Sequence, residues 1–358
     1  MQIPSIDQEL KIKITQIVRR FGRSGGMESY VYHLARALDE LGVSVSVLCE
    51  EVCDAPPKSV RVICLQRSIR KPSWLSLLWF SRQIGQLYRS NKAALGLLHS
   101  HERTAVHEVT TFHGPPFARI YEYPRYRLLS ARTQAYLFME RRELLGSQVR
   151  CVVPNSNLTR EALLKHYPLV DSRLASPILP GIGDVVIRTH RIAPPLGGVI
   201  GFVGKEWKRK GLDIVINICK KLLIQRPDLK LLILGPQECE IVALLLDYPG
   251  EVTTPGWTPS CQVYPQMDLL LHPAREEPYG MVVAEAMASQ VPVVISDQCG
   301  AKESVKPESG SVLGINQSID EWAAVAERWL QKTREIRSPY RDWKTVALEH
   351  IELYKNLT

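Results

Sequence analysis

The chain has 358 residues, of which 45% are hydrophobic and 23% are charged, and its formal net charge is +8. This length is too great for one ordinary hydrophobic core and fits two domains, and the composition is typical of a water-soluble globular protein. No run of about 18 apolar residues occurs, which excludes a membrane-spanning helix. The opening sequence MQIP has neither the basic start nor the apolar stretch of a secretory signal, so we expect a cytoplasmic protein.

The eight cysteines are scattered along the chain, and only Cys49 and Cys53 are close in sequence. This spacing indicates reduced thiols rather than a disulfide framework or a zinc ribbon. A zinc site built on the pair His99 and His101 is an alternative that we do not favour. We therefore expect no bound metal.

The positive charge is concentrated in the first half of the chain. Residues 1–180 contain 25 Lys and Arg against 15 Asp and Glu, a net charge of +10, whereas residues 181–358 contain 20 against 22, a net charge of −2. A basic half favours an anionic partner, such as a phosphorylated glycan, a membrane surface or nucleic acid. A basic half that only keeps the protein in solution is the alternative.

The first half alternates between strand and helix patterns. Residues 11–18 alternate in polarity as a strand does, and residues 27–41 carry apolar side chains at helical spacing up to Gly42. Further strands are predicted at 43–48, 60–65, 95–99, 109–112 and 148–154, and further helices at 74–88 and 158–166. Because helices separate many of the strands, the pattern predicts a parallel, doubly wound sheet.

The second half repeats this order, with strands at 198–203, 230–234, 267–272 and 291–295 and helices at 212–223 and 282–288. Residues 176–195 are rich in Pro and Gly and keep neither period, so we place the seam between two domains there. Two such domains side by side leave a cleft between the carboxyl ends of their strands, where open parallel sheets bind ligands.

A cationic loop follows the first strand of the second half. The strand ends in Gly204 and Lys205, and residues 208–211, KRKG, stand just before the next helix. Cations just past the carboxyl end of a strand are well placed to bind a diphosphate. Lysines that are only solvated are the alternative.

Two carboxylates, Glu277 and Glu285, flank a predicted helix start. Pro278 suits the first position of a helix, Gly280 lets the backbone approach a ligand, and acids about two turns apart are expected on one helix face. The helix N-terminus would bind an anion, and the carboxylates would accept hydrogen bonds from sugar and ribose hydroxyls. One solvated acid on an ordinary helix is the alternative. The polar loop at 296–303 follows the next strand and is expected on the same edge of the sheet.

Residues 269–296, LLLHPAREEPYGMVVAEAMASQVPVVIS, closely resemble the signature of the retaining glycosyltransferases of family 4, which have the GT-B fold. Their Glu-x7-Glu element matches Glu277 and Glu285, and their phosphate loop matches residues 204–211. Their glycine-rich loop matches residues 24–28, their first-domain histidine matches His113, and their hinge resembles residues 179–184.

The resemblance implies an α/β protein of GT-B fold, in which two Rossmann-like, doubly wound domains face a central cleft. It places an acceptor-binding domain at 1–178 and a nucleotide-sugar-binding domain at 179–339. Residues 340–358, which are apolar at helical spacing, would form a helix that crosses back to the first domain.

The resemblance also implies roles for individual residues. Lys205 and Lys210 would grip the diphosphate, Lys205 as a point charge where the family usually has arginine. Glu285 would bind the ribose hydroxyls and Glu277 the donor sugar, and His113 would lie near the reacting centre. The catalytic set is then His113, Glu277, Lys205 and Lys210. The other donor-binding positions are Gly25 and Gly26 in the first domain, Gly280 and Met281 at the helix start, and Trp257 near the base.

Such a site would need no metal ion. Breaking the sugar–phosphate bond builds negative charge on the diphosphate, which cations and a helix N-terminus stabilise by about 3 kcal/mol for each donor. No Asp-x-Asp occurs in the sequence. The resemblance implies retention of anomeric configuration, with attack from the leaving-group face. We therefore expect a retaining, metal-independent enzyme without a cofactor and without a side-chain nucleophile.

Arginine and tyrosine are interleaved in residues 117–142. Arginine attracts anionic lipid, and tyrosine suits the level of the lipid headgroups, so this segment is predicted to bind a membrane or a phosphorylated acceptor. The arginines expected on this surface are Arg119, Arg125, Arg127 and Arg132. A helix with inward-facing aromatics and solvated arginines is the alternative. No nucleic-acid-binding module occurs, which argues against RNA as a partner.

The overall pattern is most similar to the family branch that adds glucose to the heptose of the bacterial lipopolysaccharide core. This similarity implies transfer of a hexose, glucose, from UDP-glucose to an anionic glycolipid. The enzyme would be peripheral on the cytoplasmic face of the inner membrane. A transferase for another glycolipid or a capsular polysaccharide is one alternative. A GT-B sugar-nucleotide epimerase, which would form product without an acceptor, is another.

Overall fold

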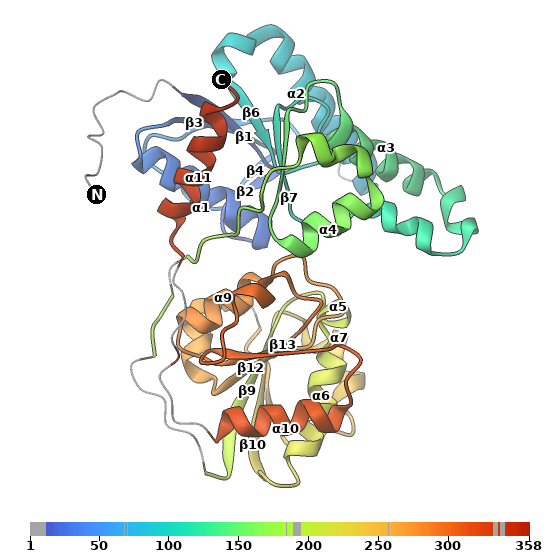
Figure 1. The fold of residues 1–358 in the computed structure, drawn as a ribbon, viewed down its shortest axis with the longest axis vertical. Coiled ribbons are helices and arrows are strands. Elements are labelled where there is room, and N and C mark those ends of the chain that lie inside the picture. Colours follow the sequence, from blue (N-terminus) through green and yellow to red (C-terminus); the bar gives the residue numbers. More distant parts are fainter. Residues whose placement is uncertain are drawn as a thin grey trace. The chain divides into compact units, whose positions relative to one another are not determined.

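The computed structural model describes residues 12–67, 69, 71–183, 185–188, 195–256, 258–331, 336 and 341–358. The chain folds into two units, each with its own parallel sheet (Figure 1). Unit 1 comprises Met1–Gly181 and Arg341–Thr358, and unit 2 comprises Ile182–Tyr340. From the sequence we place these boundaries at 178/179 and 339/340. Among the described residues, no helix has both the length and the apolar character needed to cross a bilayer.

Unit 1 contains a six-stranded sheet in the order β5-β3-β1-β6-β7-β8. The strands are β1 (Lys13–Ile17), β3 (Ser44–Cys49), β5 (Arg61–Cys64), β6 (Leu97–Ser100), β7 (Val109–Phe112) and β8 (Cys151–Pro154), and β2 (Arg20–Phe21) pairs separately with β4 (Glu51–Val52). In the centre, Ile14 lies opposite Val45 of β3 and Leu97 of β6. All pairings are parallel among the described strands, as the sequence pattern predicts.

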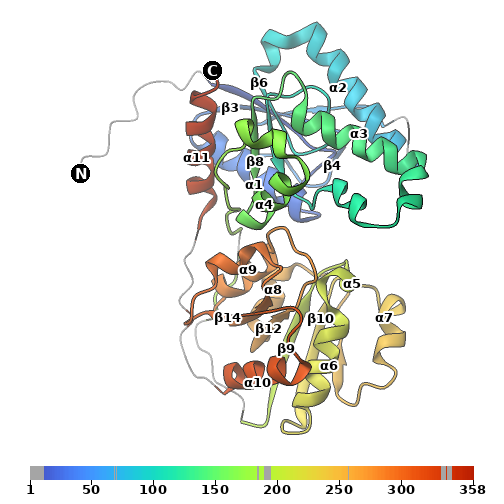
Figure 2. The ribbon, with the colours of Figure 1, turned by 45° about the vertical axis from the view of Figure 1, so that its right-hand side comes forward.

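The helices of unit 1 pack apolar faces on this sheet (Figures 1 and 2). In α1, Val31, Leu34 and Leu38 follow helical spacing and are fully buried, and Gly42, with φ of +82°, directs the chain into β3. The α-helices are α1 (Gly26–Glu40), α2 (Ser73–Leu95), α3 (Ala131–Leu145), α4 (Asn157–His166) and α11 (Trp343–Lys355), and the 3-10 helices are η1 (Phe117–Glu122), η2 (Arg125–Leu129) and η3 (Pro168–Arg173).

The C-terminal helix α11 belongs to unit 1 and packs against α1 (Figures 1 and 2). The Trp343 ring stacks on His33 with centroids 5.5 Å apart, and it packs edge-to-face with Tyr30 with centroids 5.1 Å apart. His350 and Tyr354, further along α11, are fully buried. The buried face of α11 is therefore part of the core of the first unit.

Unit 2 contains a second six-stranded parallel sheet, in the order β11-β10-β9-β12-β13-β14. Its strands are β9 (Gly197–Val203), β10 (Asp228–Leu234), β11 (Glu251–Thr253), β12 (Leu269–His272), β13 (Val293–Ser296) and β14 (Gly310–Leu313). Its helices are α5 (Trp207–Lys210), α6 (Leu212–Leu222), α7 (Glu238–Leu245), α8 (Ser260–Val263), α9 (Met281–Ala288), α10 (Ile319–Leu330), η4 (Tyr264–Gln266) and η5 (Gly300–Ser304). Helices α6 and α10 share one apolar cluster with β9, β10 and β12, in which Trp322 is fully buried.

Both sheets reverse their winding at the centre. In unit 1 the chain moves outward from β1 to β3 and β5, then returns beside β1 with β6. In unit 2 it moves from β9 to β10 and β11, then returns beside β9 with β12. Open α/β sheets bind ligands at such a switch point, beyond the carboxyl ends of the strands. Ligand-binding sites are therefore expected at the loops after β1 and β6, and at those after β9 and β12.

Candidate active site

The centre of the candidate site is an ion pair at the switch point of the unit 2 sheet. Lys210 ends α5 in the connection after β9, and Glu277 lies in the loop after β12. Lys210 Nζ is 2.8 Å from Glu277 Oε2, and the two side chains are 13% and 10% exposed. Helices α5 and α9 both lie at this edge of the sheet (Figures 1 and 2). The structure thus brings together two residues that the sequence assigned to different parts of a donor.

Two glycines set the path of the Lys210 side chain. Gly204, with φ of +150°, has no Cβ, and a Cβ there would overlap the Cδ atom of Lys210. Gly211 ends α5 in the left-handed conformation, with φ of +79°, and a Cβ there would overlap the carbonyl of Pro273. Glycine is the residue that adopts such backbone angles without a steric cost. The Lys210 stem therefore lies directly against the backbone at the end of β9.

Backbone pairing fixes the position of Glu277. It forms an isolated parallel bridge with Cys299. The Glu277 N–H donates to the Gln298 carbonyl at 2.9 Å, and the Gly300 N–H donates to the Glu277 carbonyl at 2.9 Å. The loop after β12 is therefore joined to the loop after β13. This places the 296–303 loop on the same edge of the sheet, as the sequence predicts.

Two cationic side chains and one histidine lie close to the same oxygen of Glu277. Besides Lys210, Arg209 NH1 lies 3.6 Å and His272 Nε2 lies 3.4 Å from Oε2. Burial alone would raise the pKa of Glu277, but the charge of Lys210, the contact with His272 and the charge of Arg209 outweigh it and hold this pKa well below its usual range. Burial lowers the pKa of His272, so its imidazole is neutral near pH 7. Glu277 is therefore a carboxylate, and its ion pairs with Lys210, Arg209 and His272 are all made at Oε2.

From the sequence we place Arg209 in the cationic loop without a role of its own and give no role to His272. The position of His272 in the sequence could have indicated a role. It is the last residue of β12 and therefore lies at the switch point of the sheet. Arg209 directly precedes Lys210 on the short helix α5, and its NH1 also donates to the carbonyl of Glu276. Both residues support the position and the charge of Glu277.

The helix after Glu277 begins at Met281, one residue before the helix predicted at 282–288. Its N-cap is Gly280, with φ of +98°, where a Cβ would lie 2.7 Å from Cys299 Sγ, and Met281 is the first helical residue. Glu277 lies before the helix in the bridge with Cys299, so the expectation that it shares a helix face with Glu285 is wrong. The left-handed turn at Gly280 is the physical reason, because it separates Pro278 from the helix.

The N-terminus of α9 has no side-chain cap. Its first backbone N–H groups can therefore serve an anion, as the N-terminal turns of helices do. Further along α9, Glu285 is half-buried, and its Oε2 accepts a hydrogen bond from the hydroxyl of the buried Tyr264 at 2.7 Å. Tyr264 orients this carboxylate, a role that no sequence pattern predicts.

Two other predicted donor positions are Lys205 and Trp257. Lys205 is exposed just after β9 and makes no ion pair among the described residues. Trp257, expected near the base, lies outside the described residues.

In unit 1, Gly25 and Gly26 lie at the N-terminus of α1, in the connection that follows β1. Gly25 is the N-cap and no side chain caps this helix end; a Cβ at Gly25 would overlap the carboxylate of Glu28. A Cβ at Gly26 would have no described neighbour within 4 Å. Unit 1 therefore also presents an open helix N-terminus at the switch point of its sheet, as an anion site requires.

His113 follows β7 and contacts His101, which follows β6. Nε2 of His113 lies 2.8 Å from Nδ1 of His101, and Nε2 of His101 lies 2.6 Å from Gln16 Oε1. Burial lowers the pKa of His113 to about 3 and that of His101 well below its usual value, so both imidazoles are neutral at pH 7. Within the described ranges, no group of three or more His, Cys, Asp or Glu side chains is arranged to hold a metal ion.

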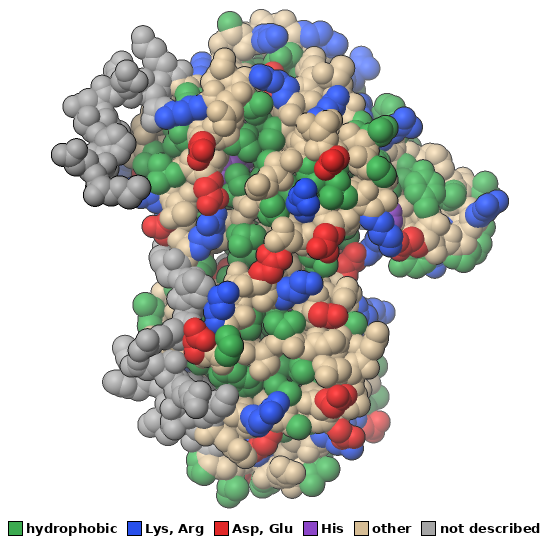
Figure 3. Space-filling model, viewed as in Figure 1, with side chains coloured by type: hydrophobic (Ala, Val, Ile, Leu, Met, Phe, Trp, Pro, Cys, Tyr) green, Lys and Arg blue, Asp and Glu red, His purple; other side chains and the backbone are tan. Residues whose placement is uncertain are grey.

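The predicted basic surface lies on η1, η2 and the start of α3, which project from the body of unit 1 (Figures 1 and 2). Arg125, Arg127 and Arg132 are exposed, and Arg119 is half-buried. Exposed aromatic and apolar side chains accompany them, and Figure 3 shows hydrophobic and cationic side chains together on this projection. They are Tyr121, Tyr123, Tyr126, Leu129 and Phe138. The reading in which the aromatics pack inward therefore fails for these side chains.

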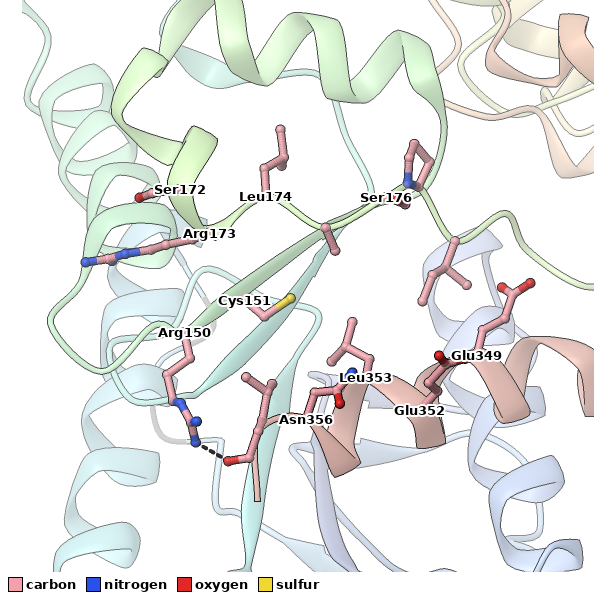
Figure 4. Close-up of a pocket in the computed structure, with 14 residues that line it drawn as sticks. Arg150, Cys151, Ser172, Arg173, Leu174, Ser176, Glu349, Glu352, Leu353 and Asn356 are labelled. Carbon is pink, nitrogen blue, oxygen red and sulfur yellow. Dashed lines mark hydrogen bonds between the residues drawn. The ribbon is translucent and has the colours of Figure 1, made fainter.

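A separate cavity of about 600 Å³ lies in unit 1, between the segment that follows β8 and α11 (Figure 4). Arg150, Cys151 and Glu352 are among the residues that line it, and Arg150 donates to the carbonyl of Leu357 beside it. No predicted donor-site residue lines this cavity. It is distinct from both switch points.

Comparison with protein families settles the class of the molecule. The model described as Glycosyltransferase Family 4 matches residues 24–182, and the model described as Glycosyl transferases group 1 matches residues 194–345. The two matches follow each other along the chain and correspond to the two units. The chain is a glycosyltransferase of GT-B fold.

Known proteins are similar to this glycosyltransferase over nearly its whole length. The D-inositol 3-phosphate glycosyltransferase of Segniliparus rotundus is 24% identical over 364 residues, which cover 86% of this chain and 76% of the relative. The crystal structure of WaaG, a glycosyltransferase involved in lipopolysaccharide biosynthesis, superposes with a TM-score of 0.77 at 18% identity and covers 96% of this chain and 95% of WaaG. Anabaena Alr3699/HepE in complex with UDP-glucose has a TM-score of 0.66 at 16% identity, with 96% and 100% coverage. These structures share the fold of the glycosyltransferase.

Proposed function

We propose that this glycosyltransferase transfers a hexose, with retention of configuration and without a metal ion, from a nucleoside diphosphate sugar to a phosphorylated acceptor. The observation that carries the proposal is the Lys210–Glu277 pair at the switch point of unit 2, beside the uncapped N-terminus of α9. A cation, a helix N-terminus and a carboxylate are the groups that a sugar diphosphate requires at its phosphates and its hydroxyls.

In this proposal the contacts of Glu277 divide between its two oxygens. Oε2 holds Lys210, Arg209 and His272, which keeps the ammonium of Lys210 beside the path of the diphosphate. Oε1 remains to accept a hydrogen bond from a hydroxyl of the donor sugar. Glu285, oriented by Tyr264, would accept from the ribose hydroxyls in the same way.

The chemistry follows from the charge that develops as the donor breaks. The bond between the anomeric carbon and the phosphate oxygen breaks with its electron pair on the leaving diphosphate. The acceptor hydroxyl then forms the new bond on the same face and gives its proton to the oxygen of the leaving diphosphate. Lys210, Lys205 and the N–H groups at Gly280 and Met281 would stabilise the developing negative charge, with about 3 kcal/mol for each preorganised donor. Gly25 and Gly26 would let a phosphate approach the α1 N-terminus of unit 1.

The similar proteins and the charge distribution support a choice of donor and acceptor. HepE binds UDP-glucose in its crystal structure, which supports UDP-glucose as the first donor to test. The basic first half and the projecting arginines support an anionic acceptor, and we propose the heptose of a lipopolysaccharide core, reached from the cytoplasmic face of the inner membrane. The relative named D-inositol 3-phosphate glycosyltransferase supports a second candidate acceptor, an inositol phosphate.

Turnover measurements separate these possibilities. The purified protein is incubated with UDP-glucose alone, with inositol phosphate, or with a phosphorylated heptose-containing core oligosaccharide, and UDP release and product are measured. We expect transfer only when an acceptor is present, and a product whose anomeric configuration by NMR equals that of the donor. Conversion of the nucleotide sugar without an acceptor would indicate the epimerase. Inversion in the product would contradict the retaining mechanism.

A matched pair of variants tests the site itself. Lys210→Ala removes the paired ammonium, and Lys208→Ala removes an exposed ammonium two residues earlier on the same helix. We expect turnover to fall at least a hundredfold in Lys210→Ala, the effect of one lost charge-stabilising donor, and to stay near wild type in Lys208→Ala. Equal activity in the two variants, with both folded by circular dichroism, would remove Lys210 from the mechanism.

A further inference from the structure

A chain of hydrogen bonds links His113 to the C-terminal helix through the centre of the unit 1 sheet. His113 contacts His101 at 2.8 Å, and His101 contacts Gln16 Oε1 at 2.6 Å. Gln16 Nε2 donates to the hydroxyl of Tyr354 at 3.3 Å, and that hydroxyl lies 2.6 Å from Nδ1 of His99. Gln16, His99, His101 and Tyr354 are each less than 5% exposed, so water does not compete for these bonds.

The carboxamide of Gln16 sets the direction of the whole chain. Its oxygen can only accept, so His101 must carry its proton on Nε2. Since burial keeps His101 neutral, its Nδ1 carries a lone pair and must accept from His113. His113 is therefore protonated on Nε2, and its Nδ1 carries the lone pair. On the other side, Gln16 donates to Tyr354, and the Tyr354 hydroxyl is then free to donate to His99.

The far end of the chain agrees with this direction. Nδ1 of His99 accepts from Tyr354, so the neutral ring carries its proton on Nε2, which lies 2.8 Å from the hydroxyl oxygen of Thr111 and donates to it. Every donor in the chain therefore meets an acceptor. If the Gln16 carboxamide were turned over, each of these bonds would reverse and His113 would carry its proton on Nδ1 instead.

We infer that Gln16, His101 and Tyr354 are positioning residues that hold His113 in the tautomer protonated on Nε2, so that its Nδ1 accepts a hydrogen bond from a hydroxyl of the donor sugar. This inference rests on the proposed function and on the family resemblance, which implies that His113 lies near the reacting centre. Nδ1 of His113 has no partner among the described residues, and His113 is half-buried rather than enclosed. A neutral ring in this tautomer cannot donate from Nδ1, so the free nitrogen suits a sugar hydroxyl and not a phosphate oxygen.

The inference also gives α11 a part in the site. Tyr354 is the group on this helix that orients the Gln16 carboxamide, and the carboxamide reaches His113 through His101. Partners of this kind, one bond removed from the group that binds substrate, fix the tautomer and the ring orientation of a histidine.

The test measures the tautomer directly by ¹⁵N NMR of the imidazole nitrogens in the full-length protein without substrate. The His113 signals are assigned by their loss in His113→Asn. We expect wild-type His113 to be protonated on Nε2 and unprotonated on Nδ1. A proton on Nδ1, or rapid exchange between the two tautomers, would overturn the inference.

Two matched variants test the source of this preference. Tyr354→Phe and Tyr88→Phe each delete one buried phenol hydroxyl of unit 1, but Tyr88 donates to Glu108 and lies outside the Gln16 chain. We expect Tyr354→Phe, and more strongly Gln16→Met, to produce a mixture of His113 tautomers and to lower kcat/KM about tenfold, while Tyr88→Phe leaves the tautomer unchanged. A single unchanged tautomer in Gln16→Met would remove Gln16 from this role.

The NMR result does not depend on turnover. If the protein fails to use any nucleotide sugar while His113 shows the expected tautomer, the proposed function fails and the hydrogen-bond assignment stands. If Gln16→Met does not fold, the wild-type spectrum and the Tyr354→Phe and Tyr88→Phe pair still decide the question.

Discussion

Lys210 Nζ and Glu277 Oε2 are 2.8 Å apart, although 67 positions separate the two residues in the chain. Their contact joins the connection after β9 to the loop after β12, at the point where the sheet reverses its winding. A lysine held by a buried carboxylate is preorganised, because its side chain is already fixed in one position before the anionic ligand binds. Preorganised charge of this kind is usually the largest contribution of a protein to transition-state stabilisation.

The position of Lys210 depends on the missing Cβ of Gly204. We expect Gly204→Ala to displace the Lys210 stem, since a Cβ would overlap its Cδ atom, and to weaken UDP binding at least tenfold. Gly42→Ala is the control, because Gly42 also has a positive φ, of +82°, but no described neighbour within 4 Å of an added Cβ. Calorimetric titration with UDP checks the prediction, and equal affinity in both variants would show that Gly204 does not position Lys210.

Unit 1 should lose stability as the pH falls below about 6.5. Burial lowers the pKa of its central histidines, to about 3 for His113, about 4 for His107 and His350, and well below the usual value for His99 and His101. The unfolded chain, with a histidine pKa of about 6.5, therefore binds more protons in acid and gains about 1.4 kcal/mol per pH unit for each excess proton.

Two acids oppose this trend without cancelling it. Burial raises the pKa of Glu102 and of Glu143 to about 7, so between about pH 7 and 4.5 these carboxyls take up protons in the folded state and stabilise it. The histidines outnumber them, so the net effect of acid is destabilisation. Urea unfolding from pH 7 to pH 5, monitored by hydrogen exchange in β6 and β7, measures this effect. Stability of these strands that stays constant or rises toward pH 5 would contradict the pKa directions.

The projecting arginines should bind anionic membranes. Each cation near such a surface contributes about 1 kcal/mol, so replacing Arg125, Arg127 and Arg132 together by Gln should weaken binding to phosphatidylglycerol vesicles roughly a hundredfold. The control replaces Arg82, Arg89 and Lys92, which are exposed on α2. Flotation or surface plasmon resonance at low and high salt gives the measurement. An equal loss in the two triple variants would show a general effect of net charge instead of a specific surface.

Turnover should survive removal of divalent metal. Lys210, Lys205 and the α9 N-terminus supply the positive charge that a metal ion would otherwise bring to the diphosphate. We expect less than a twofold change in kcat after dialysis against a chelator, roughly 0.4 kcal/mol in the barrier. Loss of activity that Mg²⁺ or Mn²⁺ restores would replace the lysine-based mechanism with a metal-assisted one.

The elements of the fold could be predicted from the sequence because the local pattern specifies them. The strand over Val109–Phe112 is found within the same bounds, and the helix predicted at 212–223 forms as Leu212–Leu222. All four residues of the strand are buried, and the buried residues of the helix belong to one core cluster, so local and tertiary preferences agree.

The details of the site could not be predicted from local sequence patterns. Pro278 and the spacing of the two acids predict a shared helix face for Glu277 and Glu285, but the left-handed backbone of Gly280 starts the helix at Met281, after Glu277. The bridge between Glu277 and Cys299, and the hydrogen bond from Tyr264 to Glu285, depend on contacts between distant segments. The same is true of Gln16 and Tyr354, which are ordinary core positions until the sheet and α11 bring them to the histidines.

The most direct test of the donor site is calorimetric titration of UDP, in the presence of a chelator, into wild type, Lys210→Ala and Lys208→Ala. A charge-assisted hydrogen bond contributes about 1.5–3 kcal/mol, so Lys210→Ala should bind UDP ten- to a hundredfold more weakly, while Lys208→Ala should bind like the wild type. Equal affinity in all three proteins, or no UDP binding by the wild type, would contradict the assignment of the Lys210–Glu277 pair to a nucleoside diphosphate sugar.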